Sequence, residues 1–189
     1  MKTLDLVKMA MYLALFTVLD VFASQLPIFQ MPNGGSLGLG TVVLLLAAYD
    51  LGWMKGLTVA LLSIVMQILF TKTYLLRFDQ IFFDYILPFG IYGLAPLLGL
   101  FPKKASGKAS PLNLVLGATL TNLIRLISHA WVGVFYWLPQ DPEVNPASYW
   151  AGSISYNAGY MIPTLIYCVI LLPILYEVLW PMIKRQNQI

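Results

Sequence analysis

The sequence predicts an all-α membrane protein that crosses the bilayer several times. Of its 189 residues, 59% are hydrophobic and only 10% are charged, a balance that does not suit a water-facing surface. A helix that spans the hydrocarbon core needs about 20 apolar residues, and apolar runs of this kind account for most of the chain. We therefore expect a single transmembrane domain over residues 1–189, with no sizeable soluble domain.

Apolar runs between glycines, prolines and charge clusters predict a bundle of six transmembrane helices. The expected spans are Val7–Leu26, Leu37–Ala48, Gly56–Phe70, Phe82–Phe101, Leu112–Trp137 and Tyr156–Met182. The second and third are short and follow one another closely, so five spans with a tilted or partly buried hairpin are an alternative. The first is interpreted as a retained helix, because no small-residue cleavage site follows it.

The distribution of charge predicts that both termini are cytoplasmic and that the protein is a multi-pass protein of the cell membrane. With six spans, the inner segments hold most of the basic residues, which are Lys2, Lys8, Lys55, Lys103, Lys104, Lys108, Lys184 and Arg185, whereas the outer loops hold Lys72 and Arg77. The acidic residues near the outer loops, Asp79, Asp84, Asp141 and Glu143, would attract a cation from outside, although topology alone explains the last two. The basic residues lie where lipid headgroups are, so membrane lipids and no nucleic acid are the expected contacts.

Four charged or titratable side chains fall inside the expected spans, at Asp20, Asp84, Arg125 and His129. Such groups cost about 2.5–3.5 kcal/mol each on insertion scales and are therefore candidates for function. Arg125 and His129 are four residues apart and share one helix face, which must look into protein or a cavity. An internal ion pair of Arg125 with Asp20 or Asp84, and a core role for His129, are the structural alternatives.

Polar and aromatic side chains also gather at the expected outer ends of the fourth, fifth and sixth helices. These are Asp84 and Tyr85, the ring-rich end at Trp131, Phe135, Tyr136 and Trp137, and the string Ser153 to Tyr160 with Tyr156 and Asn157. A carboxylate, an imidazole, an amide and several rings are suited to enclose a flat, cationic, hydrogen-bonding molecule. For the string before the sixth helix, a helix N-cap followed by packing is the alternative.

The sequence does not favour catalysis or metal binding. It contains no GxSxG, HExxH, P-loop or paired-carboxylate motif, and a single His and a single Cys (Cys168) cannot build a multi-His metal site or a disulfide within the chain. We expect no enzyme, no metal and no cofactor. An intramembrane enzyme using Asp84, Arg125 and His129 is an alternative, which we disfavour because these residues are expected at different depths. A structural subunit without a cavity is another.

Several strings resemble the thiamine-specific substrate-binding subunits, or S-components, of energy-coupling factor (ECF) vitamin transporters. They are Pro32-Asn33-Gly34-Gly35-Ser36, Gly52 to Gly56, Tyr74 with Phe83-Asp84-Tyr85, Arg125 with His129 and Trp137, and Ser155-Tyr156-Asn157 continuing through Tyr160-Met161-Ile162-Pro163. The likeness covers most of the chain. It departs near Gly35, where a family member can place a stacking Trp, and at Asp84, where the family can have Glu.

The resemblance implies a six-helix bundle of the S-component type in a bacterial membrane that binds thiamine near its outer face and has no ATPase activity. Carried over by position, Asp84, His129 and Asn157 would be polar ligands and Tyr74, Tyr85 and Trp137 ring contacts. Tyr156, Tyr160 and Arg125 complete the candidate substrate-binding set. Ala10 and Ala14 would dock a transmembrane coupling subunit, which works with two ATPase subunits. Riboflavin and a pyrimidine or thiazole precursor are the alternative cargoes.

Overall fold

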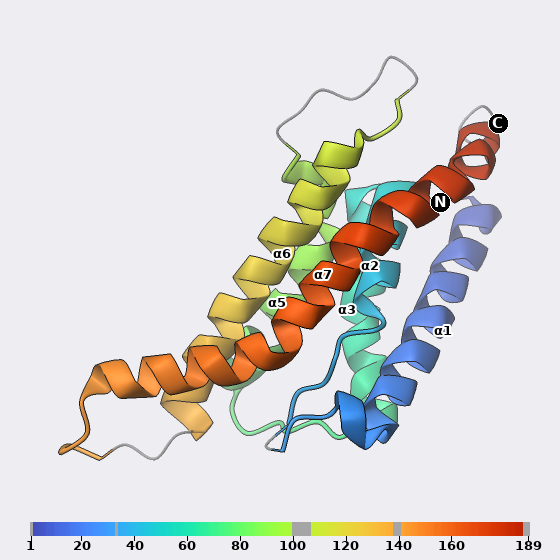
Figure 1. The fold of residues 1–189 in the computed structure, drawn as a ribbon. Helices are drawn as coiled ribbons and strands as arrows, with labels where there is room; N and C mark the ends of the chain where they lie inside the picture. The colour runs from blue at the N-terminus through green and yellow to red at the C-terminus, as the bar shows by residue number, and fades with distance from the viewer. Residues whose placement is uncertain (1, 33, 100–106, 138–140, 187–189) are drawn as a thin grey trace.

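The computed structural model describes residues 2–32, 34–99, 107–137 and 141–186, and within these ranges it is helical without strands. An isolated bridge between Gln30 and Ser36 is the one β-type pairing found there. Six helical segments run alternately up and down the bundle, with both chain ends at the same side (Figure 1). The predicted all-α class is confirmed.

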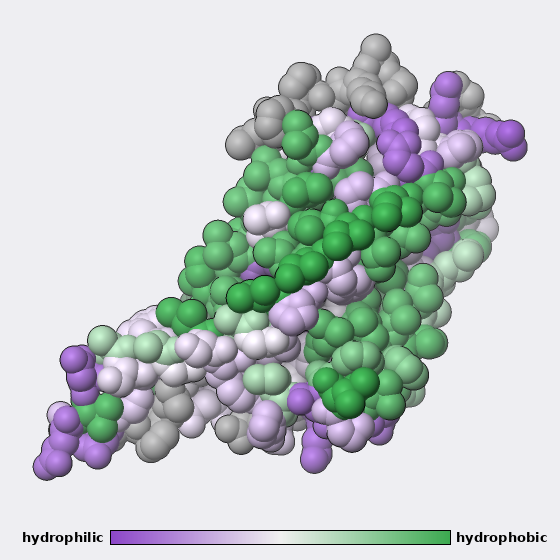
Figure 2. All heavy atoms as spheres, in the orientation of Figure 1, coloured by the Kyte–Doolittle hydropathy of each residue, from purple (hydrophilic) through white to green (hydrophobic). Residues whose placement is uncertain are grey.

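Among the described residues, four helices are long and apolar enough to cross a membrane, judged by length and composition. They are α1 (Thr3–Gln25), α3 (Trp53–Phe70), α6 (Pro111–Val132) continued by the π-helix η4 (Gly133–Trp137), and α7 (Pro146–Gln186). In the view of Figure 2, hydrophobic residues cover the middle of the molecule and hydrophilic residues gather at its two ends. This arrangement fits a protein embedded in a bilayer.

Helix α2 (Thr41–Leu51) is about 16 Å long, too short to cross a bilayer alone. Every residue from Thr41 to Ala48 is buried, and α2 contacts α1, α3, α5 and α7, so it forms the centre of the bundle. The predicted span began at Leu37, which is wrong by four residues. Residues 37–40 are not helical, and the Tyr167 hydroxyl donates to the carbonyl groups of Gly38, at 3.1 Å, and Leu39.

The fourth segment is a broken helix rather than the continuous span Phe82–Phe101 that we predicted. It consists of α4 (Phe78–Ile81), the π-helix η2 (Phe82–Ile86), α5 (Leu87–Gly93) and the 3₁₀ turn η3 (Ala95–Leu97), and Phe101 lies outside the described residues. Pro88 cannot donate a hydrogen bond to the carbonyl of Asp84, so it disrupts the α-helical ladder at that turn. The wider π turn therefore falls on Asp84, in keeping with the frequent occurrence of such turns at functional sites.

Helix α7 begins at Pro146, ten residues before the predicted start at Tyr156. The Asn145 side chain accepts a hydrogen bond from the amide of Ala147 at 3.0 Å and so caps the helix ahead of the Ser153 to Tyr160 string. With 41 residues the helix would extend about 60 Å, twice the hydrocarbon thickness, and Figure 1 shows that it is bent. Pro163, inside the helix, removes one backbone hydrogen bond.

Ion pairs fasten α1 to the α2–α3 hairpin at the end of the bundle that carries the chain termini. Lys8 contacts Asp50 at 2.8 Å, with a further hydrogen bond of 2.8 Å from Tyr12, and Lys55 contacts Asp5 at 2.8 Å. The Asp50 side chain is only 4% exposed, so the Lys8–Asp50 pair is better shielded from water than the Lys55–Asp5 pair. Helix α1 is thereby fixed at one end, and its other end borders the candidate site.

Candidate functional site

The candidate site is built around the Asp84 carboxylate on the π turn η2. One oxygen of Asp84 lies 2.9 Å from Nδ1 of His129 on α6, and the other accepts a hydrogen bond of 2.8 Å from the Gln80 amide. The Asp84 and His129 side chains are 15% and 13% exposed. Because both carboxylate oxygens accept hydrogen bonds, the arrangement favours the ionised form of Asp84.

The imidazole of His129 is held between Asp84 and Arg125. Arg125 Nε, which always carries a hydrogen, donates to Nε2 of His129 at 3.2 Å. Nε2 must therefore be the unprotonated nitrogen, and Nδ1 carries the hydrogen that faces Asp84. The hydrogen-bond network thus assigns a neutral His129 in the Nδ1–H tautomer.

Arg125 is buried, with 7% of its surface exposed, and its contacts are polar and aromatic. Its Nη1 donates to the hydroxyls of Tyr92 at 3.3 Å and Thr41 at 3.4 Å, and its guanidinium carbon lies 4.7 Å from the centre of the Phe89 ring. The ion pair with Asp20 or Asp84, which was the structural alternative for Arg125, is not found as a direct contact among the described residues. The Asp84 carboxylate is reached instead through His129.

Three of the predicted ring residues, Tyr74, Tyr85 and Trp137, belong to the cluster around Asp84. The rings of Tyr74 and Trp137 meet edge to face with centres 5.4 Å apart, and both residues are over 40% exposed. The Tyr74 amide donates to the Tyr85 hydroxyl at 3.0 Å, and the Tyr74 carbonyl accepts from Gln80 at 3.1 Å. Gln80 therefore links these rings to the carboxylate.

The predicted residues of α7 form the opposite side of the cluster. The Tyr160 hydroxyl donates to the Asn157 side chain at 2.6 Å, and the Tyr160 ring meets the His129 ring edge to face at 6.4 Å. Both Asn157 and Tyr160 are buried. The Tyr156 hydroxyl donates to the carbonyl of Gly34 at 2.8 Å, so α7 also holds the loop that joins α1 to α2.

That loop lies on the site through Gly34 and Gly35, which both have positive φ angles, +96° and +89°. A Cβ atom on Gly35 would lie 2.8 Å from the Tyr160 ring, whereas a Cβ atom on Gly34 would lie 3.8 Å from Tyr74. The absence of a side chain at Gly35 thus lets the backbone of the loop lie directly against the Tyr160 ring. Asn33 of the same motif lies outside the described residues.

All nine predicted substrate-binding residues therefore gather at one end of the bundle, with Gln80, Tyr92 and Thr41 as supporting residues that the sequence reading did not select. Gln80 is fully buried and stands four residues before Asp84, so helix periodicity could have identified it. Asp84, Arg125 and His129, which we expected at different depths, form one hydrogen-bonded chain. The π turn moves Asp84 into reach of His129.

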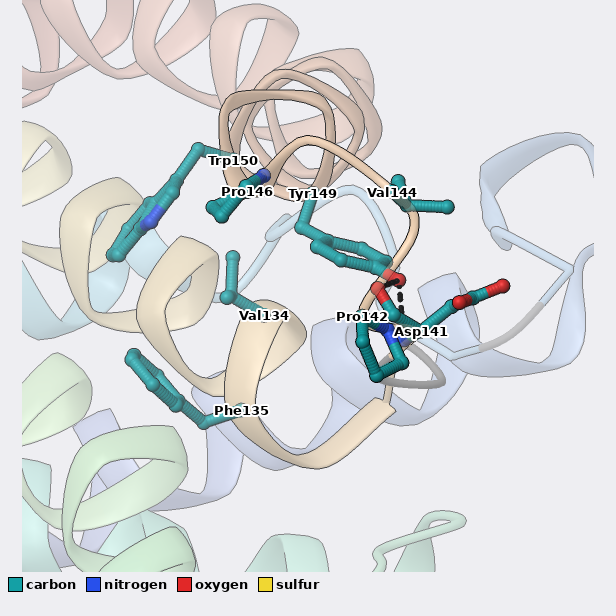
Figure 3. A pocket seen from close by; sticks show the side chains of 8 residues that line it. All are labelled: Val134, Phe135, Asp141, Pro142, Val144, Pro146, Tyr149 and Trp150. Atoms are coloured by element: carbon teal, nitrogen blue, oxygen red, sulfur yellow. Dashed lines mark hydrogen bonds between the residues drawn. The ribbon is translucent and has the colours of Figure 1, made fainter.

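A cavity of about 370 Å³ lies beside this cluster, between η4 and the first turn of α7 (Figure 3). It is lined by Val134, Phe135, Asp141, Pro142, Val144, Pro146, Tyr149 and Trp150. None of the nine candidate residues lines it, and the Asp141 carboxylate points away from its rings (Figure 3). The lining of the cavity is therefore mostly apolar. We place the candidate site at the cluster around Asp84 and not in this cavity.

The loop contact gives a testable prediction for the two glycines. Gly34→Ala and Gly35→Ala both place a side chain in the left-handed region, at a cost of about 1–2 kcal/mol each, but only the second also overlaps a buried ring, at about 1–3 kcal/mol more. We expect the larger fall in unfolding temperature for Gly35→Ala. Thiol-reactive dye can report unfolding in detergent, because the single Cys168 is fully buried. Equal shifts would mean that the loop does not rest on Tyr160.

Comparisons with known proteins agree with this architecture. Residues 6–184 match the thiamine transporter protein family (Thia_YuaJ). Thiamine transporter ThiT of Bacillus subtilis (strain 168) is 27% identical over 175 residues, which cover 90% of this chain and 89% of that protein. A solved structure of ThiT from Listeria monocytogenes has the same fold, with a TM-score of 0.65 at 18% identity, over 96% of this chain and 97% of that chain. The resemblance inferred from the sequence is confirmed, and the chain belongs to the thiamine transporter protein family.

Proposed function

We propose that this protein is the substrate-binding S-component of an ECF-type importer and that it captures thiamine at the outer side of the membrane. The observation that carries the proposal is the Asp84 carboxylate, held by His129 and Gln80 among aromatic rings at one end of the bundle. Membership of the thiamine transporter family favours thiamine over riboflavin or a pyrimidine or thiazole precursor.

Thiamine combines a permanently cationic thiazolium ring with a flat aminopyrimidine ring, and the cluster offers a partner for each feature. The Asp84 carboxylate supplies the counter-charge, Asn157 and His129 supply hydrogen-bonding groups, and Tyr74 and Trp137 supply ring faces for stacking and cation–π contact. These side chains bond to one another in the ligand-free protein, so we infer that binding separates them and displaces the Gly34–Gly35 loop.

We propose a binding role without catalysis. In the ligand-free protein both imidazole nitrogens of His129 are engaged, Nδ1 with Asp84 and Nε2 with Arg125, an arrangement that suits an imidazole oriented for hydrogen bonding. The nearby Ser128 hydroxyl donates to the carbonyl of Phe83 rather than to the imidazole. The trio considered as an acid–base group therefore lacks a nucleophile with an adjacent base.

The proposal predicts that Asp84→Asn weakens thiamine binding much more than Asp141→Asn. A hydrogen bond to a charged group is worth about 1.5–3 kcal/mol, so the Kd should rise about 10- to 100-fold for the first variant. The second variant should change the Kd less than about twofold, since exposed charges contribute little. Isothermal titration of detergent-purified protein measures both. Equal effects would place the site elsewhere, and a wild-type protein that does not bind thiamine at micromolar concentration would exclude the proposed cargo.

We further propose that the single transmembrane domain lies in a bacterial cell membrane with both termini in the cytoplasm. The start of α1, the turn between α2 and α3, the start of α6 and the end of α7 lie at the end that carries the termini, whereas the segment between α3 and α4 lies at the other end (Figure 1). The first group of segments carries Lys2, Lys8, Lys55, Lys108, Lys184 and Arg185, and the other segment carries Lys72 and Arg77. Lys103 and Lys104 lie outside the described residues. The site around Asp84 then faces outward.

The transmembrane coupling subunit is proposed to dock on α1, with two ATPase subunits bound to it. Ala10 and Ala14 are both exposed and lie one turn apart on the same face. Their larger neighbours Met11 and Leu15 are exposed as well, at 66% and 49%. The two small side chains would let another helix approach the α1 backbone closely.

This docking surface predicts that a large side chain at Ala10 or Ala14 weakens assembly with the coupling subunit and leaves thiamine binding unchanged. Ala10→Trp and Ala14→Trp should each reduce by about tenfold the amount of coupling and ATPase subunits that co-purify with the tagged chain, which corresponds to about 1.4 kcal/mol. The Kd for thiamine should stay within about twofold of its original value. Met11→Trp, which adds less volume at an exposed position of the same helix, is the matched control. Co-purification that survives both alanine variants would exclude this face.

A further inference from the structure

The chain between α3 and α4 carries the candidate ring residue Tyr74 without helical support. Residues 71–77 are not helical, so their backbone amides and carbonyls need partners outside a helix. Gln80 supplies two of these partners, since its side-chain Oε1 accepts from the amide of Leu76 at 3.2 Å and its Nε2 donates to the carbonyl of Tyr74 at 3.1 Å. The Tyr85 hydroxyl accepts from the Tyr74 amide at 3.0 Å. Side chains of the broken helix therefore fix the path of this segment.

The orientation of the Gln80 amide follows from its three side-chain contacts. The Leu76 amide is a donor and must face Oε1, whereas the Tyr74 carbonyl and the Asp84 carboxylate are acceptors and must face Nε2. A flipped amide would lose all three hydrogen bonds. Gln80 is fully buried, where unpaired polar groups are costly. The side chain is therefore held in one orientation.

Gln80 thereby contacts two parts of the candidate site at once. Its Nε2 donates to the Asp84 carboxylate at 2.8 Å, and the same nitrogen holds the backbone of Tyr74, whose ring meets the Trp137 ring with centres 5.4 Å apart. Because one nitrogen serves both contacts, the carboxylate cannot shift relative to the Tyr74 backbone without breaking a hydrogen bond. The Tyr74 ring itself stays free to turn toward a ligand. Gln80 thus sets the separation between the charge and the ring pair.

A second buried glutamine, Gln67 on α3, has a different set of contacts. Gln67 is 8% exposed, and its Nε2 donates to the carbonyl of Ser63, four residues earlier in the same helix, at 3.4 Å. This contact lies within one helix and joins no two elements. The partners of the Gln80 side chain belong instead to the non-helical segment and to the π turn η2. The two glutamines therefore have the same chemistry and comparable burial but different connections.

We propose that Gln80 is a positioning residue for ligand binding: it fixes the spacing between the Asp84 carboxylate and the Tyr74–Trp137 ring pair, and so favours cations whose charge and flat ring reach both. The inference rests on the proposed function. It adds a residue that acts on the ligand through Tyr74 rather than by contact. Holding the two groups at a fixed spacing before the ligand arrives lowers the cost of ordering them on binding.

The experiment is a double-mutant cycle on thiamine binding, measured by titration calorimetry of the purified full chain. Gln80→Met replaces the amide by an unbranched apolar side chain and removes its hydrogen bonds, whereas Tyr74→Ala removes the ring and leaves the carbonyl that Gln80 binds. Each single variant should raise the Kd about tenfold. If Gln80 acts through Tyr74, the double variant should raise the Kd about 10- to 20-fold, well below the roughly 100-fold product of independent effects.

Two controls separate this role from general packing. Gln67→Met makes the same exchange at the buried glutamine of α3 and should change the Kd less than about twofold, since its contact lies within one helix. A second cycle pairs Gln80→Met with Asn157→Ala on α7, where the Asn157 side chain bonds to Tyr160 and Ser153. In that cycle the two effects on the Kd should multiply.

Two results would overturn the inference: effects that multiply in both cycles, as a merely structural role predicts, or an unchanged Kd for Gln80→Met. Circular dichroism checks that each variant is folded, and Gln80→Leu replaces Gln80→Met if the latter is not. A wild-type protein that does not bind thiamine would remove the proposed function itself. Thiamine binding with independent effects of Gln80 and Tyr74 would remove only the role of Gln80.

Discussion

The hydrogen-bonded chain from Arg125 through His129 to Asp84 is the interaction on which the candidate site depends. Each member restricts the next, because the guanidinium occupies Nε2 of the imidazole and leaves Nδ1–H for the carboxylate. A buried arginine is costly unless its donors are satisfied, and here hydroxyl groups and the face of Phe89 serve that purpose. Asp84 is consequently oriented without being neutralised by direct contact with a cation.

The fold brings this chain together by local departures from regular helix. Pro88 removes the hydrogen bond to the Asp84 carbonyl, and the π turn that results turns Asp84 toward α6. The short helix α2 places Thr41 in the centre of the bundle, where it reaches Arg125. The glycine loop then covers Tyr160. The site is thus built from the irregular parts of an otherwise simple helical bundle.

Much of the fold could be predicted from the sequence, because apolar runs of sufficient length have few alternatives in a bilayer. Helices α1, α3 and α6 begin and end within a few residues of the predicted spans. The start of α7 was missed because Ser, Gly and Asn lower the hydropathy of its first turns, although Pro146 and the cap at Asn145 are helix-start signals. The break at Pro88 was missed because hydropathy does not register backbone geometry.

The residues of the site could be found because charges within apolar spans are conspicuous, but their partners could not. That Arg125 donates to His129, and that Gln80 joins Asp84 to Tyr74, depend on distances between helices that no spacing in the sequence specifies. The tautomer of His129 is the most direct test of the arrangement. Because the chain has a single histidine, nitrogen-15 NMR of the imidazole in ligand-free protein reads it without ambiguity. We predict a protonated Nδ1 and an unprotonated Nε2 at neutral pH, whereas a protonated Nε2 or a doubly protonated ring would contradict the account.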